Sequence, residues 1–141
     1  MNEHLLAEKE FQLAIAPVTF TPDDTARMLL ACIEHFREQY GPDLPIQRLS
    51  VLLTVATNPQ IQQLDIAKIV NASESSVSRH VMDMTYLTRS QEPGPELLVQ
   101  RQDPAFRRRN LVDLGPKGQN LIDQFAALAT NAYNNAAAAR R

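Results

Sequence analysis

The 141-residue chain has one cysteine, no tryptophan, only four glycines and no long apolar run. A single cysteine cannot form a disulfide within the chain, so nothing indicates an oxidising compartment. Apolar stretches such as residues 51–53 are far shorter than the roughly 18 residues that cross a bilayer. The first residues are acidic where a secretory signal would be basic, and no apolar segment follows them. We therefore expect a cytoplasmic protein without a membrane partner.

Several function classes lack their usual residues. His4, His35 and His80 lie far apart and have no metal-ligand spacing with Cys32, so we expect no metal. The sequence also contains no Gly-x-Ser-x-Gly motif and no glycine loop for phosphate, and it has no paired carboxylates framed by apolar residues. We expect neither a cofactor nor an enzyme. Hydrophobic residues make up 44% and charged residues 21%, a mixture typical of one globular domain with helical extensions.

The net charge of −2 is unevenly distributed along the chain. Residues 1–60 carry eight acidic against four basic side chains, whereas residues 61–141 carry eight against ten. Within residues 98–118, two aspartates face four arginines and one lysine. A local basic site on an acidic body can bind DNA, because phosphate attraction depends on the field at the contact surface.

Apolar spacing predicts long helices at both ends of the chain. Residues 1–20 are poorly specified, although Leu5, Leu6, Phe11, Leu13 and Ile15 are apolar enough to pack. Thr21 can cap a helix that Pro22 opens and that ends near residues 40–42. A second helix is expected between Pro45 and Asn58. The last helix begins at Pro116, and its alanine-rich tail is expected to fray because it has nothing large to bury.

The middle of the chain predicts a helix-turn-helix. Residues 63–70 form a short helix, with Leu64, Ala67 and Val70 expected inward. Residues 71–73 break it. A helix over residues 74–85 is expected to bury Val77, Val81 and Met84. Two short helices joined by a three-residue turn are typical of a DNA-binding helix-turn-helix. A plain helical hairpin with a solvated face is the alternative.

The second of these helices has an exposed face suited to a major groove. Ser75 and Arg79 lie opposite the apolar face, with Ser73 at the cap. Hydroxyls can bond phosphates or base edges, and arginine can bind guanine through two hydrogen bonds. The residues expected to contact DNA on this segment are Ser73, Ser75, Ser76, Arg79 and His80.

A basic hairpin follows the helix-turn-helix. Residues 97–99 and 110–114 read as short strands, and the turn between them contains Arg107, Arg108 and Arg109. The one nearby acid cannot pair with all three arginines, which suits contact with a polyanion such as the DNA minor groove. The predicted fold is mainly α with a small β-wing. Its divisions are an N-terminal extension and dimerisation helix (1–43), a winged helix-turn-helix core (44–115) and a C-terminal dimerisation helix with its tail (116–141).

These residues resemble the MarR family of bacterial transcription regulators. The family's helix-turn-helix pattern corresponds here to Ser73-Glu74-Ser75-Ser76-Val77-Ser78-Arg79. Its more specific wing pattern, D-P-x-D-R-R-R-x-L-V-x-L-T-P-K-G, corresponds to Asp103-Pro104-Ala105-Phe106-Arg107-Arg108-Arg109-Asn110-Leu111-Val112-Asp113-Leu114-Gly115-Pro116-Lys117-Gly118. The resemblance covers residues 49–125.

The chain departs from that pattern in three places. Phe106 replaces the second acid of the wing, so that any salt bridge that stiffens the tip must come from Asp103. Gly115 replaces a threonine that would cap the last helix. Residues 85–97 make the connection between the recognition helix and the wing longer than in the family, which leaves the placement of the wing open.

The resemblance implies a homodimer built from the terminal helices, and the sequence agrees. Apolar helix surface left over after one core is filled is typical of a dimer interface. The resemblance also implies a small aromatic ligand between the dimer helices and the DNA-binding core. The cluster expected near that place is Leu29, Ile33, Phe36, Leu52 and Val55. These residues fit an ordinary core equally well, in which case the protein binds DNA constitutively. Cys32 is interpreted as a small buried hydrophobic residue.

The predicted function is sequence-specific binding of double-stranded DNA by a homodimeric transcription regulator, a repressor acting on a pseudo-palindromic operator. Two alternatives remain. The chain could be a plasmid or phage DNA-binding protein for replication or partition, or it could be a winged-helix adaptor for protein contacts. The wing arginines argue against the adaptor, whereas nothing in the sequence separates the first alternative from a regulator.

Overall fold

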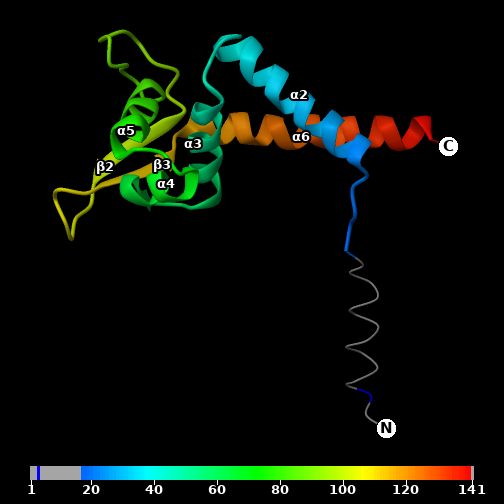
Figure 1. The fold of residues 1–141 in the computed structure, drawn as a ribbon, viewed down its shortest axis with the longest axis horizontal. Helices are drawn as coiled ribbons and strands as arrows, with labels where there is room; N and C mark the ends of the chain where they lie inside the picture. Colours follow the sequence, from blue (N-terminus) through cyan, green and yellow to red (C-terminus); the bar gives the residue numbers. More distant parts are fainter. Residues whose placement is uncertain (1–2, 4–16, 141) are drawn as a thin grey trace.

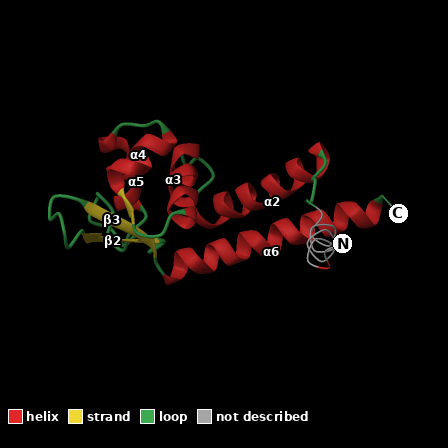
Figure 2. Cartoon of the chain, turned by 90° about the horizontal axis from the view of Figure 1, so that it is seen from below, coloured by secondary structure: helices red, strands yellow, loops and turns green. Residues whose placement is uncertain are grey.

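The computed structural model describes residue 3 and residues 17–140, and the apolar residues noted between positions 5 and 15 lie outside them. Two long helices form an arm that extends from a body of three shorter helices and a sheet (Figures 1 and 2). The expectation of a mainly helical chain with a small β-wing is confirmed. None of the described helices is long and apolar enough to cross a membrane.

The arm consists of α2 (Pro22–Tyr40) and α6 (Pro116–Ala139), which run antiparallel (Figure 2). Helix α2 begins at the predicted cap. Thr21 Oγ1 accepts a hydrogen bond from the Asp24 N–H at 3.1 Å, and the Asp24 carboxylate accepts one from the Thr21 N–H at 3.2 Å. This reciprocal capping box satisfies two backbone donors at the helix start. Gly115 at the start of α6 makes no side-chain cap, as expected from its lack of a hydroxyl.

The prediction that the alanine tail frays is wrong, because α6 continues to Ala139. The tail packs along α2 and ends in an ion pair: Arg140 Nη1 lies 2.6 Å from Asp24 Oδ1. Asp24 is almost fully buried, and the Arg140 guanidinium lowers the pKa of its carboxyl group. Phe20 also packs edge-on against Tyr133, with ring centroids 5.5 Å apart. These contacts bring the first residues of α2 against the last residues of α6.

The body contains α3 (Ile46–Thr57), α4 (Gln63–Val70) and α5 (Glu74–Asp83), close to the predicted bounds. Asn71 adopts the left-handed conformation that ends α4 and opens the turn. Val77, Val81 and Met84 are buried as predicted. The predicted inward position of Leu64 is wrong, since its side chain is 42% exposed. Ala67 is buried as predicted, and Ile66 takes the buried position beside it.

The sheet has three antiparallel strands in the order β1-β3-β2. Strands β2 (Leu98–Gln102) and β3 (Asn110–Leu114) form the predicted wing hairpin, with Leu98 opposite Leu114. Strand β1 (Ile61–Gln62) was not predicted, because two residues carry no periodic pattern. It joins the sheet through the pair formed by Ile61 and Val112. The wing is therefore attached to the chain between α3 and α4.

The core lies where the three short helices, the sheet and the base of the arm meet. Its members are Phe36, Leu49, Val51, Leu52, Val55, Ile61, Ile66, Ala67, Val77, Val81, Met84, Leu97, Leu98, Val112, Leu121 and Phe125. The arm thus supplies three residues to the core of the body. The boundaries drawn at residues 43 and 115 remain a prediction.

The longer connection between α5 and β2 forms a closed loop. Both the Leu97 N–H and the Leu98 N–H donate to the Met84 carbonyl, at 2.8 and 3.0 Å, so that the chain leaves and returns at one point. Further along the loop, the Gly94 N–H donates to the Tyr86 carbonyl at 2.9 Å. A side chain at Gly94 would place its Cβ 2.0 Å from the Thr85 carbonyl oxygen. The open question of wing placement is thereby answered: β2 starts directly beside the end of α5.

Candidate nucleic-acid interface

Three serines gather at the amino-terminal end of α5. The Ser73 hydroxyl accepts a hydrogen bond from the Ser76 N–H at 3.1 Å, which is the cap expected from the sequence. The same hydroxyl lies 2.9 Å from Ser76 Oγ and 3.2 Å from Ser75 Oγ. Ser73 and Ser75 are exposed, and Ser76 is half-buried. The cluster therefore presents small hydroxyl groups and leaves space for a partner to approach closely.

Arg79 lies on the exposed side of α5, opposite the buried Val77 and Val81. Within the described part of the chain, no ion pair engages its guanidinium. A guanidinium that is not held by a carboxylate keeps all its donors for an external acceptor. The guanidinium of Arg79 is thus accessible, and its contact with DNA remains a prediction.

His80 has contacts that the sequence did not predict. Arg48 Nε donates to its Nδ1 at 3.3 Å, and its Nε2 lies 3.0 Å from Gln47 Oε1. Burial, and then the charge of Arg48, lower the pKa of His80 below the ordinary 6.5. A neutral ring fits this arrangement, since Nδ1 then accepts and Nε2 donates. Both ring nitrogens contact α3 through Arg48 and Gln47, and the contact of His80 with DNA remains a prediction.

Asp83 fixes the other end of α5. Its carboxylate lies 3.1 Å from Arg48 Nη2 and 2.7 Å from Arg89 Nη2, and it is largely buried. The hydrogen bonds from Arg89 are the main cause of the lowered pKa of the Asp83 carboxyl group. Arg48 thus holds both His80 and Asp83 and sets the angle of α5 on α3. No sequence signal identified these partners of α5. Gln47 and Arg48 are far from α5 along the chain, and Arg89 lies beyond its end.

Short hydrogen bonds define the tip of the wing. The Asp103 N–H donates to the Arg109 carbonyl at 2.8 Å, and Asp103 Oδ1 accepts from the Ala105 N–H at 2.9 Å. Asp103 therefore holds the tip through hydrogen bonds of its N–H and its carboxylate to backbone groups, and among the described residues it forms no salt bridge. The guanidinium carbon of Arg109 lies 4.6 Å from the ring centroid of Phe106, a cation–π contact.

The wing arginines Arg107, Arg108 and Arg109 are all exposed. Among the described residues, none of the three takes part in an ion pair. Arg108 and Arg109 line a hollow of about 80 Å³ together with Leu64 and with Glu74 at the start of α5. The hollow shows that the base of the wing tip lies beside the helix-turn-helix. Serine hydroxyls and arginines from two elements can therefore meet one polyanionic surface.

The five residues expected around a ligand do not form one group. Phe36, Leu52 and Val55 belong to the buried core, and Ile33 packs against it. Leu29 is 57% exposed on the arm. Cavities of about 580 and 470 Å³ are lined by other residues, the first between α2 and α6 and the second beside Tyr86 and Lys117. The ligand site remains a prediction.

Metal binding and a reactive cysteine are the two other kinds of site to consider in the described residues. Within residues 17–140 and at residue 3, no group of three or more histidine, cysteine or acidic side chains could hold a metal ion. Cys32 is half-buried, and its Sγ donates to the Phe125 carbonyl at 3.4 Å. Burial raises the pKa of this thiol. The arrangement fits the interpretation of Cys32 as a packing residue, because a reactive cysteine needs a lowered pKa.

A helix-turn-helix followed by a β-hairpin defines a winged helix. Comparison with solved structures shows which winged-helix proteins have a similar fold. No protein-family model and no curated protein sequence matches the chain. A variant of MepR from S. aureus bound to an oligodeoxyribonucleotide has a TM-score of 0.64 and 16% identity, over 81% of this chain and 76% of that one. A MarR-family transcriptional regulator from Rhodococcus sp. RHA1 has a TM-score of 0.54 and 20% identity, over 79% of this chain and 71% of that one.

A third structure is similar over a greater share of the chain. The PcaV transcriptional regulator from Streptomyces coelicolor, in complex with its natural ligand, has a TM-score of 0.52 and 18% identity, over 90% of this chain and 86% of that one. The chain thus has the winged-helix fold of MarR-type transcriptional regulators, as its helix-turn-helix and wing motifs had indicated.

Proposed function

We propose that the protein is a sequence-specific, double-stranded DNA-binding transcription regulator. The observation that carries the proposal is the shared surface of α5 and the wing, where Arg79 and three wing arginines are exposed beside the serine cluster. Arginine at the recognition helix suits base edges in the major groove, and arginine on the wing suits phosphates and the minor groove. The DNA-bound relative in fold is consistent with this assignment.

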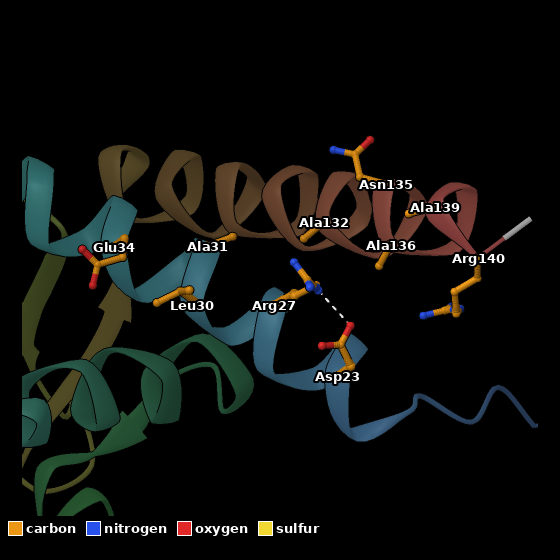
Figure 3. A pocket seen from close by; sticks show the side chains of 10 residues that line it. All are labelled: Asp23, Arg27, Leu30, Ala31, Glu34, Ala132, Asn135, Ala136, Ala139 and Arg140. Carbon is orange, nitrogen blue, oxygen red and sulfur yellow. Dashed lines mark hydrogen bonds and ion pairs between the residues drawn. The ribbon is translucent and has the colours of Figure 1, made fainter.

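The acting species is a homodimer joined through the arm. Leu29 and Leu30 are adjacent on α2 and are 57% and 59% exposed. Leu30 also lines the groove of about 580 Å³ between α2 and α6, whose floor is built from alanines of both helices (Figure 3). Small side chains let a further helix approach closely, and exposed leucines gain from being covered. A second copy of the arm satisfies both conditions.

A two-fold dimer places two copies of α5 on one duplex. The expected operator is therefore a pseudo-palindrome with half-sites about one helical turn apart, roughly 34–36 Å. A dimer bound there excludes other proteins from the same DNA, which favours repression. A small aromatic ligand would release the DNA only if it bound the DNA-incompetent spacing of the two winged helices more tightly.

The proposal is tested by selecting duplexes from a random-sequence library and measuring affinity by fluorescence anisotropy at several salt concentrations. Arg79→Ala should cost about 1–3 kcal/mol on the selected duplex and relax its sequence preference. Arg107→Ala should weaken selected and random duplexes alike and flatten the salt dependence. Arg37→Ala, which removes an arginine from the arm, is the matched control and should leave both affinities unchanged.

The outcomes separate the alternatives. A protein that binds no duplex even at low salt would favour the adaptor. Equal losses on selected and random DNA for Arg79→Ala would contradict its role in base recognition. A selected sequence that lies in replication or partition regions rather than beside promoters would favour the plasmid or phage alternative.

A further inference from the structure

The tip of the wing carries an apolar surface among its arginines. Pro104, Ala105 and Phe106 are consecutive and exposed, and Phe106 keeps 56% of its surface in contact with solvent. The preceding Asp103 uses a carboxylate oxygen to hold the Ala105 N–H, so that the turn is tight. Single exposed apolar residues are common on proteins, whereas three in a row at the projecting end of a hairpin form an apolar surface that is available to a partner. Figure 1 shows this hairpin extending away from the helices.

The Phe106 ring is held in place from one side. The Arg109 guanidinium lies 4.6 Å from the ring centroid, and the Arg109 N–H donates to the Phe106 carbonyl at 2.9 Å. The contact orders the ring while the rest of it stays exposed. An ordered, exposed aromatic ring flanked by cations is preorganised to enter a negatively charged groove.

We propose that Phe106 acts as a wedge that enters the DNA minor groove and partly unstacks one base step. This inference rests on the proposed DNA-binding function. Proteins that insert Phe, Leu or Pro into the minor groove kink the duplex by about 20–90° toward the major groove. The wing arginines bring the tip to the narrow, negative groove, and Phe106 with Pro104 supplies the apolar wedge.

The wedge gives the protein a way to read sequence without hydrogen bonds to bases. Pyrimidine–purine steps such as TA and CA unstack more easily than other steps. Duplexes that carry such a step under the wing tip are therefore bound more tightly. Phe106 sets specificity at the outer edge of each half-site, whereas Arg79 sets it within the half-site.

The test uses the full chain and the duplex selected from a random-sequence library. The fluorescent base 2-aminopurine replaces one adenine at a time in the flanks, because its emission rises when it loses its stacking partners. Binding of the wild-type protein should raise the emission at one flanking step on each side. Phe106→Ala should lose this rise at saturating protein, although it still binds the duplex.

Two further variants distinguish two roles of Phe106, insertion between bases and support of the Arg109 guanidinium through its ring. Phe106→Leu keeps an apolar wedge without a ring, so it should retain the emission rise. Ile46→Ala removes an exposed apolar side chain from α3 and should behave like the wild type. The inference is overturned if the wild-type protein binds without raising the emission, if Phe106→Ala raises it equally, or if Phe106→Leu behaves like Phe106→Ala. A wild-type protein that binds no duplex overturns the proposed function as well.

Discussion

Removing the exposed leucines of the arm tests the dimer quantitatively. Full burial of a leucine side chain contributes about 1.5–3 kcal/mol. Leu29 and Leu30 are 57% and 59% exposed, so covering each contributes about 1–2 kcal/mol on that scale. A two-fold interface that covers both residues buries four such side chains, which amounts to about 4–7 kcal/mol.

Truncation to alanine removes three of the four side-chain carbons of each leucine. The double variant Leu29→Ala/Leu30→Ala should therefore weaken the dimer by about 3–5 kcal/mol, which corresponds to a roughly 10²–10⁴-fold higher dissociation constant. Sedimentation velocity over nanomolar to micromolar concentrations measures this constant. Both leucines are more than half exposed, so their loss should leave the fold of the monomer intact by circular dichroism.

Ile69→Ala is the matched control, because Ile69 is 58% exposed but lies on α4 in the body. It should leave the dissociation constant unchanged. The reasoning is refuted if the double variant stays within threefold of the wild type, or if the wild-type protein is a monomer at micromolar concentration.

Two other predictions concern pH and ligands. The pKa of His80 is lowered in the folded protein, so the unfolded chain takes up a proton at this residue as the pH falls through 6.5 while the folded protein resists it. The free energy of unfolding should therefore fall from pH 7.5 to pH 5.5 in denaturant titrations, and His80→Gln should reduce this fall; an identical fall in the variant would contradict it. Titration of the DNA complex with phenolic and aryl acids should release the DNA if a small aromatic ligand controls binding, and a complex that survives millimolar concentrations of every acid indicates constitutive binding.

The sequence predicted most of the elements because their signals are local. Thr21 and Pro22 mark the start of α2, and Asn71 with Ser73 marks the turn of the helix-turn-helix. The hairpin strands follow from short apolar runs on either side of a basic turn. All these signals lie within a few residues of the element that they specify.

The features that were missed depend on residues far apart along the chain. The end of α6 is fixed by the pairing of Arg140 with Asp24, which are 116 positions apart. His80 contacts Gln47 and Arg48, which no periodic pattern of α5 could indicate. Leu64 was assigned inward with Ala67 because it is apolar, but Ile66 rather than Leu64 lies in the core beside Ala67.

The closed loop between α5 and β2 determines where the wing is attached. The Met84 carbonyl holds the amides of Leu97 and Leu98, so the wing is anchored at the base of the loop and not by the residues within it. Two residues within the loop are also fixed in place, because Arg89 pairs with Asp83 at the end of α5 and Gly94 has no room for a side chain beside Thr85. A peptide or fluorophore attached at Ser90, which is exposed in this loop, would label the connection between α5 and β2. The segment that separates this chain from the family pattern thus holds the first residue of the wing directly beside the end of the recognition helix.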